Sequence, residues 1–152
     1  MPRRPPVALA LLATLAACTS GTSGTSGRPT GLRVTPVNGL PAKTLLACRD
    51  LTGLLPGELS SGIERRGVTP ASDTTSAYGD PAITVRCGVP VGSDRDDPYT
   101  FNEVRWALHD SGASRTWTTL GRSVNVEVVI PDTYSSQAEL VGTISLSVKK
   151  IS

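Results

Sequence analysis

The chain has 152 residues, of which 38 % are hydrophobic, 18 % charged and 4 % aromatic. This is enough for one domain with a modest aliphatic core, and it argues against both a disordered chain and an aromatic platform for nucleic acid. Arg3 and Arg4 account for the net charge of +2, so the 13 Lys and Arg from Cys18 onward match the 13 Asp and Glu. A neutral chain has no broad attraction for polyanions, and we therefore expect no nucleic-acid partner.

The first 17 residues have the organisation of an export signal. Arg3 and Arg4 give a basic start, and Val7–Ala17 follows without a charge. As a helix this apolar run would be about 16 Å long, roughly half of a hydrocarbon core of about 30 Å. We therefore predict a secretory signal peptide over residues 1–17 rather than a permanent transmembrane helix.

The end of the apolar run, Leu15-Ala16-Ala17-Cys18, resembles the bacterial lipobox. The resemblance implies that Cys18 receives a diacylglyceryl group and becomes the new N-terminus. Two or more acyl chains anchor a protein stably where one does not, so we expect a lipid anchor, palmitate included, on the extracytoplasmic face of the cell membrane. The alternative is an ordinary secreted protein in which Cys18 is a small apolar residue.

Residues 18–31 are expected to form a tether. After the cysteine, Thr-Ser-Gly occurs three times over Thr19–Gly27, and none of these side chains can build a core. Twelve such residues have a root-mean-square reach of about 20 Å. The globular domain is then expected over residues 32–152.

The two remaining cysteines, Cys48 and Cys87, form an even pair in a chain that is expected to be exported. A disulfide between them closes a loop of about 40 residues, for which chain entropy suggests a stabilisation of about 4 kcal/mol. Metal binding by these cysteines is the less favoured interpretation, because the chain has no CxxC motif and its one histidine is His109. We expect a structural disulfide, no metal and no cofactor.

The first half of the domain contains one helical and two extended patterns. Leu32–Val37 is a short strand candidate, and Pro41 suits the first turn of a helix. Apolar residues then recur at helical spacing until Pro56-Gly57: Leu45, Cys48, Leu51, Leu54 and Leu55. The stretch Ala71–Ala77 is typical of a loop. Ile83–Cys87 alternates as a half-buried strand, and its parity directs Cys87 into the core.

Three further strands are predicted from alternation. Val104–His109 and Arg115–Leu120 form a hairpin around the turn residues Asp110–Ser114. Val124–Ile130 has the most regular alternation in the chain, and Pro131 ends it.

The C-terminal segment fits a helix that begins at a capping box, Ser136-x-x-Glu139. Its helical spacing runs through Val141, Ile144, Val148 and Ile151, whereas Ile144, Leu146 and Val148 also fit a strand. With the helix preferred, the fold class is α+β. We expect a single small domain in which two helices pack on one face of a mostly antiparallel sheet of about four strands, with one disulfide.

Candidate catalytic and metal residues are few. His109-Asp110 is the only pair that could begin a hydrolase argument, but no G-x-S-x-G motif exposes a nucleophile, and a surface histidine is the simpler interpretation. The acidic stretch Asp94–Asp97 departs from calcium-loop spacing at Pro98, which favours a solvated loop. We therefore assign no catalytic residue.

The tryptophans and arginines are the better binding candidates. Trp106 shares the inward parity of its strand and is expected in the core, whereas the register of Trp117 is open. An exposed Trp117 beside Arg86 or Arg122 could bind a sugar or a carboxylate by stacking and charge-assisted hydrogen bonds. The alternative is that the arginines brace loops by binding backbone carbonyls.

Three segments together resemble the actinobacterial secreted lipoproteins of the domain of unknown function 3515 family. They are Leu45–Pro56, Tyr78–Pro90, and Trp117 with Arg122 and Val126–Pro131. The most specific part is Gly79-Asp80-Pro81 followed by Arg86-Cys87-Gly88, and the resemblance extends over about residues 32–151. Tyr78 stands where the family often has Trp. The resemblance implies an actinobacterial envelope, but no activity and no catalytic residue.

The hypothesis that follows is a lipid-tethered, disulfide-stabilised envelope module that binds or assists a partner without catalysis. Its partners would be the membrane, through the lipid, and an envelope protein or a cell-wall fragment. One alternative is a small envelope hydrolase that uses His109 with a serine or aspartate. The other is a purely structural spacer lipoprotein.

Overall fold

Alternating segments of the sequence form most of an antiparallel sheet that carries two helices on one face. The computed structural model describes residues 31–91 and 98–151, and Cys18 with the predicted signal peptide and the Thr-Ser-Gly repeat lies outside them. The elements in chain order are β1 Leu32–Arg33, α1 Ala42–Leu54, β2 Arg65–Arg66, β3 Val68–Thr69, β4 Thr75–Tyr78, β5 Ile83–Cys87, β6 Tyr99–Phe101, β7 Val104–Asp110, β8 Ser114–Leu120, β9 Val126–Pro131 and α2 Gln137–Val148.

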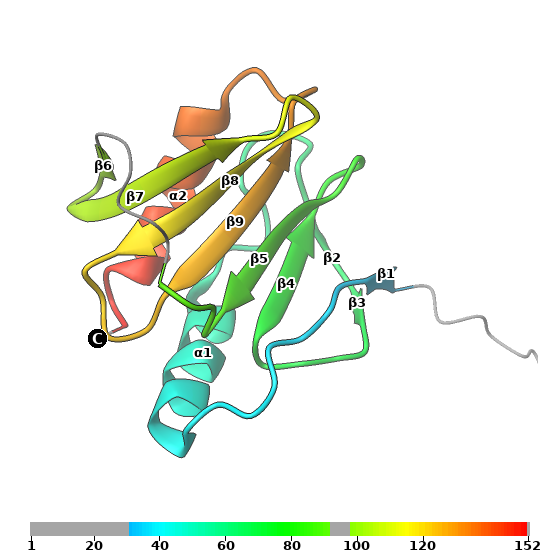
Figure 1. Cartoon of the computed structure of the whole chain (residues 1–152). Helices are drawn as coiled ribbons and strands as arrows, with labels where there is room; N and C mark the ends of the chain where they lie inside the picture. The colour runs from blue at the N-terminus through cyan, green and yellow to red at the C-terminus, as the bar shows by residue number, and fades with distance from the viewer. Residues whose placement is uncertain (1–30, 92–97, 152) are drawn as a thin grey trace, which may run out of the picture.

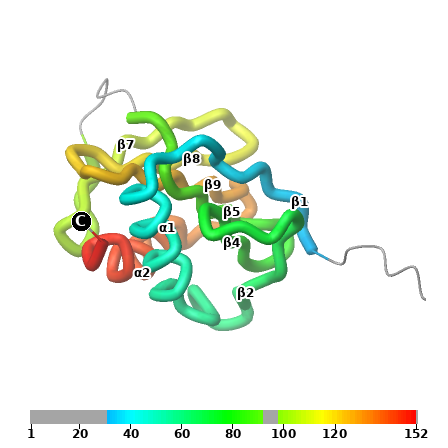
Figure 2. Tube along the Cα trace, turned by 90° about the horizontal axis from the view of Figure 1, so that it is seen from below, coloured from blue at the N-terminus to red at the C-terminus, as the bar shows by residue number. Residues whose placement is uncertain are grey.

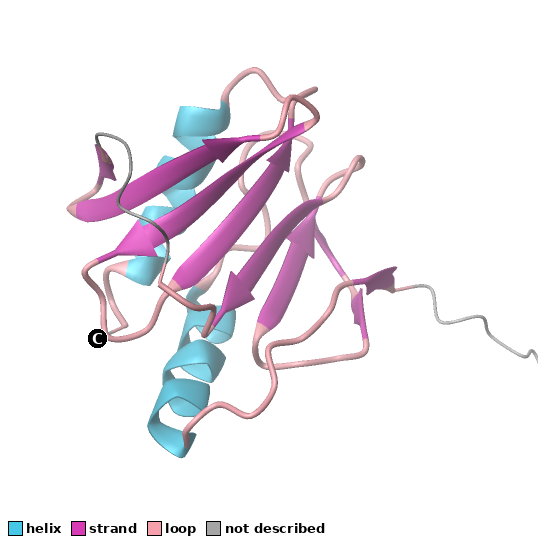
Figure 3. Ribbon diagram, viewed as in Figure 1, coloured by secondary structure: helices cyan, strands magenta, loops and turns pink. Residues whose placement is uncertain are grey.

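The main sheet has seven strands in the order β2-β4-β5-β9-β8-β7-β6, and each neighbouring pair is antiparallel. Both helices lie behind this sheet in Figure 1, and the view from below in Figure 2 places them on the same side of the strands. Figure 3 separates the two layers by colour. A small parallel pair, β1 with β3, stands beside the sheet. The predicted α+β class with two helices is confirmed, but the predicted number of about four strands is wrong.

The error in strand number comes mainly from β4. The sequence of this segment, Thr75-Ser76-Ala77-Tyr78, has small polar residues and no alternation, and so favours a loop. All of these residues are nevertheless buried, because β4 lies inside the sheet between β2 and β5. Strands β2 and β6 have only two and three residues, which is too short for a periodic pattern.

Helix α1 begins directly after Pro41, where the missing proline N–H leaves no intrahelical bond unmade. Its sheet-facing stripe is Cys48, Leu51 and Leu55, which are at most 5 % exposed. Leu54 and Leu45, which the helical spacing placed in the same apolar set, are 41 % and 43 % exposed. The prediction of the helix is therefore confirmed, and its apolar face is narrower than expected.

Helix α2 is also confirmed, and Leu146 distinguishes it from the strand alternative. A strand would bury Leu146 with Ile144 and Val148, whereas a helix turns the residue between them outward. Ile144 and Val148 are fully buried and Leu146 is 46 % exposed. Ser136 takes the N-cap position as expected, but its side chain makes no capping hydrogen bond.

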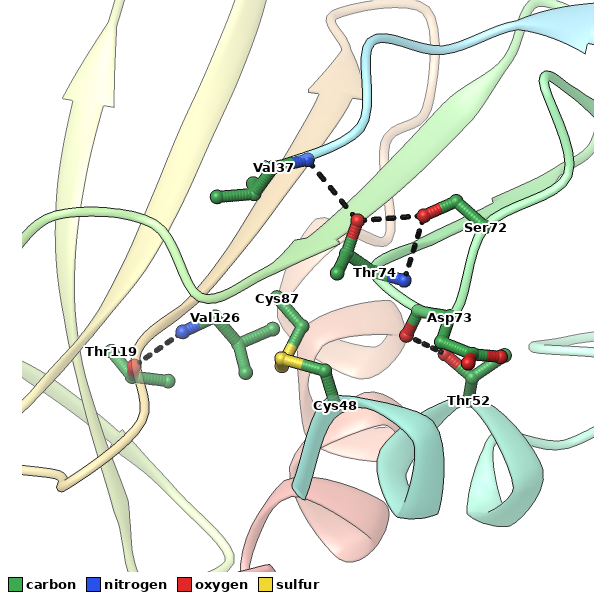
Figure 4. The surroundings of a disulfide bond; sticks show 9 residues. All are labelled: Val37, Cys48, Thr52, Ser72, Asp73, Thr74, Cys87, Thr119 and Val126. Carbon is green, nitrogen blue, oxygen red and sulfur yellow. Dashed lines mark hydrogen bonds between the residues drawn. A yellow bond between two sulfur atoms is a disulfide. The ribbon is translucent and has the colours of Figure 1, made fainter. Parts of the chain in front are cut away.

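The disulfide between Cys48 and Cys87 joins α1 to β5 in the middle of the core (Figure 4). The two Cα atoms are 5.5 Å apart, and neither residue is more than 2 % exposed. The helical stripe brings one cysteine to the sheet, and the strand parity turns the other toward the helix. The predicted pairing is thus confirmed.

Candidate functional site

The three residues predicted to bind a ligand lie in three different places. Trp117 on β8 faces the helices, since it is paired with Leu108 and Val128, and it is only 4 % exposed. Its indole N–H donates to the Oε1 atom of Gln137 on α2 at 3.4 Å. The rings of Tyr99 and Phe101 meet it edge-on. The register of the hairpin, which the sequence left open, turns this residue into the core, so Trp117 is not available for stacking on a ligand.

Arg86 lies on the opposite face of the sheet from Trp117. On β5 it alternates with Val85 and Cys87, whose side chains are buried in the core. Its Nη1 atom donates to Oε1 of Glu127 across the neighbouring strand β9 at 3.1 Å. Arg86 is therefore held in a cross-strand ion pair.

Arg122 binds the end of α2. Its guanidinium donates to the carbonyl oxygen of Val148 at 2.9 Å and also to that of Ile151. Carbonyls at a helix C-terminus have no intrahelical partner and carry partial negative charge. An arginine stabilises them both by donating hydrogen bonds and by its positive charge. This is the bracing role that the sequence left open, and Arg86, Trp117 and Arg122 do not line one site.

His109 is exposed near the end of β7. Its neighbour Asp110 accepts hydrogen bonds from the N–H of Gly112 and from Arg115, and these bonds lower the pKa of the Asp110 carboxyl. In the described part of the chain, no hydrogen bond joins His109 to a serine or a carboxylate. Asp110 therefore serves the hairpin turn, and none of the described residues orients the histidine by a hydrogen bond.

No cluster of three or more potential metal ligands occurs among the described residues, and none of the helices described there is long and apolar enough to cross a membrane. The acidic stretch Asp94–Asp97 lies outside the described residues.

A groove of about 650 Å³ lies along the outer flank of α1, and we call it the α1 groove. Residues of α1 form most of it, and the chain after α2 contributes the rest. The residues that decide its chemistry are Lys43, Leu46, Arg49, Asp50, Leu54 and Lys150. None of the residues that line the groove is a serine, threonine, cysteine or histidine.

Helical geometry explains why these residues share one flank. Positions 46, 50 and 54 of a helix fall within an arc of about 80°, and position 46 lies almost opposite the buried stripe. The hydroxyl of Ser147 on α2 donates to the carbonyl oxygen of Leu54 at 2.9 Å, which joins the C-terminal ends of the two helices. Lys150 follows α2 directly and so reaches the same groove.

The α1 groove combines apolar and positive groups. Leu46 is 60 % exposed and Leu54 41 %. The lining also has three cations, Lys43, Arg49 and Lys150, and one carboxylate, Asp50. The exposed leucines of α1 have a signal in the sequence. Leu45-Leu46 and Leu54-Leu55 are pairs of neighbours, and neighbours in a helix point about 100° apart, so one narrow stripe cannot bury all of them.

A second hollow of about 300 Å³ lies between the end of α1 and the strands β2 to β4. Arg65 lines it, but its guanidinium donates to the carbonyl oxygen of Thr52 at 2.9 Å and to Ser76 Oγ at 3.0 Å. It also reaches the carbonyl oxygen of Leu55 at 3.4 Å. Arg65 is therefore engaged in closing the C-terminal end of α1, and this hollow is the weaker candidate.

A family model described as protein of unknown function (DUF3515) matches residues 5–151. No curated protein and no solved structure matches the chain.

Proposed function

Since the chain belongs to the DUF3515 family, whose description gives no activity, we propose a function from the chain's own residues. It is a membrane-anchored lipoprotein of the cell envelope that binds a partner and does not catalyse a reaction. Its setting is an actinobacterial envelope, in keeping with the resemblance noted above. The lipid on Cys18 holds it at the extracytoplasmic face of the cell membrane.

The observation that carries this proposal is the pairing of two of the three cysteines with each other. Cys48 and Cys87 are paired in a buried disulfide, which is a bond typical of exported proteins. The pairing leaves Cys18, and this cysteine stands at the end of Leu15-Ala16-Ala17 after an uncharged run. Its sequence context therefore supports a modified terminus rather than a third structural thiol.

The α1 groove supports the binding part of the proposal. A glycan is bound mainly by stacking on aromatic rings and by neutral hydrogen bonds, and none of the residues that line the groove is aromatic. Leucines beside lysines and an arginine favour a partner that is apolar and negatively charged. A neutral cell-wall glycan is thus a poorer fit to this groove than a charged amphipathic partner.

Metabolic labelling tests the anchor. Cells that express the full chain are grown with labelled palmitate, in parallel with cells that express Cys18→Ser. We expect label on the processed wild-type protein and none on the variant, with the wild-type protein in the membrane fraction. An unlabelled wild-type protein that is released into the medium contradicts the proposal.

A further inference from the structure

We propose that the α1 groove, together with Leu146, is a membrane-contact surface that lays the domain against an anionic lipid bilayer. Leu46, Leu54 and Leu146 enter the boundary between headgroups and acyl chains. Lys43, Arg49 and Lys150 bind the lipid phosphates. The inference rests on the proposed function in one respect, which is that the domain is held near a membrane.

The apolar component is concentrated on the helical layer. Single exposed leucines are ordinary, but a group of them on one surface marks an interaction site. Leu46, Leu54 and Leu146 are large hydrophobic residues of the two helices that are exposed in the described part of the chain. Leu45 is also exposed on α1, but it lies outside the groove. Leu146 is the chain neighbour of Ser147, whose hydroxyl donates to the carbonyl oxygen of Leu54 at the end of α1. These leucines are neither members of the hydrophobic core nor among the partly buried residues that pack against it.

The charges around these leucines are mostly positive. Lys43, Arg49 and Lys150 line the α1 groove with Asp50 as its one carboxylate. Lys149 lies next to Lys150 in the chain and is paired with Glu103 at 3.5 Å. Because the chain from Cys18 onward is formally neutral, this excess is a local feature and not a consequence of overall composition. Leucines flanked by cations are the combination that binds anionic membrane surfaces.

A lipid surface fits better than a protein partner on grounds of size. A stable protein interface uses about 20–30 residues on each side. Nine residues line the α1 groove, which is too few for such an interface on its own. A membrane contact has no such requirement here, because the covalent anchor already holds the domain at high local concentration and the groove has only to orient it.

The geometry of the anchor allows this orientation. Figures 1 and 2 place β1, where the described chain begins, on the side of the molecule away from the C-terminus and so away from Lys150. The 12 residues between Cys18 and Gly31 span at most about 40 Å when extended. A domain of this size is roughly 35 Å across. The α1 groove can therefore reach the membrane surface while Cys18 remains in it.

Photo-crosslinking of the processed full chain tests the inference. A photoreactive amino acid is placed at position 46, and in a matched control at position 45, which is also exposed on α1 but is outside the groove. Each protein is mixed with vesicles of phosphatidylcholine alone or of phosphatidylcholine with phosphatidylglycerol. Mass spectrometry then measures phospholipid adducts on the peptide that carries the probe, which is separate from the Cys18 peptide.

We expect at least about tenfold more phospholipid adduct at position 46 than at position 45 in the anionic vesicles, and a loss of about tenfold without phosphatidylglycerol. Lys43→Glu with Lys150→Glu should produce a similar loss, whereas Arg105→Glu, an exposed arginine on β7, should not. Equal labelling at both positions, or labelling that is independent of lipid charge, overturns the inference.

The same probe in living cells separates the remaining outcomes. A protein-sized adduct at position 46 overturns the membrane contact in favour of a protein partner, even if palmitate is present on Cys18. Lipid adducts at position 46 in anionic vesicles, without palmitate on Cys18, support the contact surface and contradict the anchor. The two proposals therefore fail in different ways.

Discussion

The indole nitrogen of Trp106 on β7 donates a hydrogen bond to the hydroxyl of Ser145 on α2 at 3.0 Å, and neither residue is exposed at all. Ser145 in turn donates to the carbonyl oxygen of Val141 at 2.7 Å. This is a buried polar contact between the sheet and the helical layer.

Substitution of Ser145 by alanine should be costly. Ser145→Ala leaves the buried indole N–H without an acceptor, and we expect a loss of about 1–3 kcal/mol in the free energy of unfolding. Urea denaturation followed by tryptophan fluorescence measures it. Thr143→Ala, at a half-buried position of the same helix, is the control and should change stability by less than half as much.

The disulfide should contribute through the unfolded chain. Cys48 and Cys87 are 39 positions apart, and for a loop of that length the entropy estimate is about 4 kcal/mol. The double variant Cys48→Ala and Cys87→Ala should lose up to that amount in a denaturant titration. Thiol labelling of the processed wild-type protein should detect neither cysteine, and labelling of both would contradict the pairing.

Arg122 should act on stability and not on binding. Arg122→Met keeps the apolar part of the side chain but removes the donors to Val148 and Ile151. We expect a loss of about 1–2 kcal/mol in unfolding free energy and faster amide exchange at the end of α2. Arg105→Met removes an exposed arginine and should have no comparable effect. A ligand-binding role would instead appear as unchanged stability.

Alkaline pH should weaken the fold through Tyr78. Burial raises the pKa of the Tyr78 phenol above its ordinary value of 10.0, and the nearby positive charge of Arg65 opposes this in part. The unfolded chain therefore loses the proton first. The stabilisation is complete below about pH 10 and is lost as the pH rises through the higher folded-state pKa.

Tyr78→Phe isolates this effect. The variant loses the hydrogen bond from the phenol to the carbonyl oxygen of Pro56 at neutral pH, at a cost of about 1 kcal/mol. Its unfolding free energy should then fall less steeply than that of the wild type between about pH 9 and about pH 11. Parallel curves for the two proteins would contradict the assignment.

Gly88 should resist replacement for two reasons. Its φ is +83°, and a Cβ atom there would collide with the Leu40 side chain. We expect Gly88→Ala to lose about 2–3 kcal/mol in unfolding free energy. Gly112 has a similar φ of +78° but open space around it, so Gly112→Ala should show the backbone cost alone, about 1 kcal/mol.

The sequence predicts those parts of the fold in which burial and periodicity coincide. The alternation in Ile83–Cys87 predicts a strand with one buried face, and the spacing of Ile144 and Val148 predicts a helix with one buried face. The structure confirms both elements. Thr75–Tyr78 is buried on both faces although three of its four residues are small. Its place inside the sheet is decided by its neighbours β2 and β5, which no local pattern reveals.

The positions of the candidate site residues could not be predicted from local sequence patterns, because they depend on contacts between distant parts of the chain. Whether Trp117 faces the helices or the solvent is decided by the register of the β7–β8 hairpin, and a shift of one residue reverses it. The groups to which the Arg122 guanidinium donates are set by the position at which α2 ends. Leu46 was visible as part of a leucine pair, but its role as a wall of a groove needs Lys150, over 100 positions later in the chain.

The place of β9 in the sheet bears on how the protein is made. A chain that emerges on the far side of a membrane from its N-terminus delivers β4 and β5 well before β9, which fills the gap between β5 and β8. Until then β5 would offer an unpaired edge, with Cys87 next to the missing partner, to any other extended chain nearby. Under the proposed export, folding of this domain should therefore depend on fast delivery of its last third or on a holding chaperone, and crowding of half-emerged copies should favour aggregates.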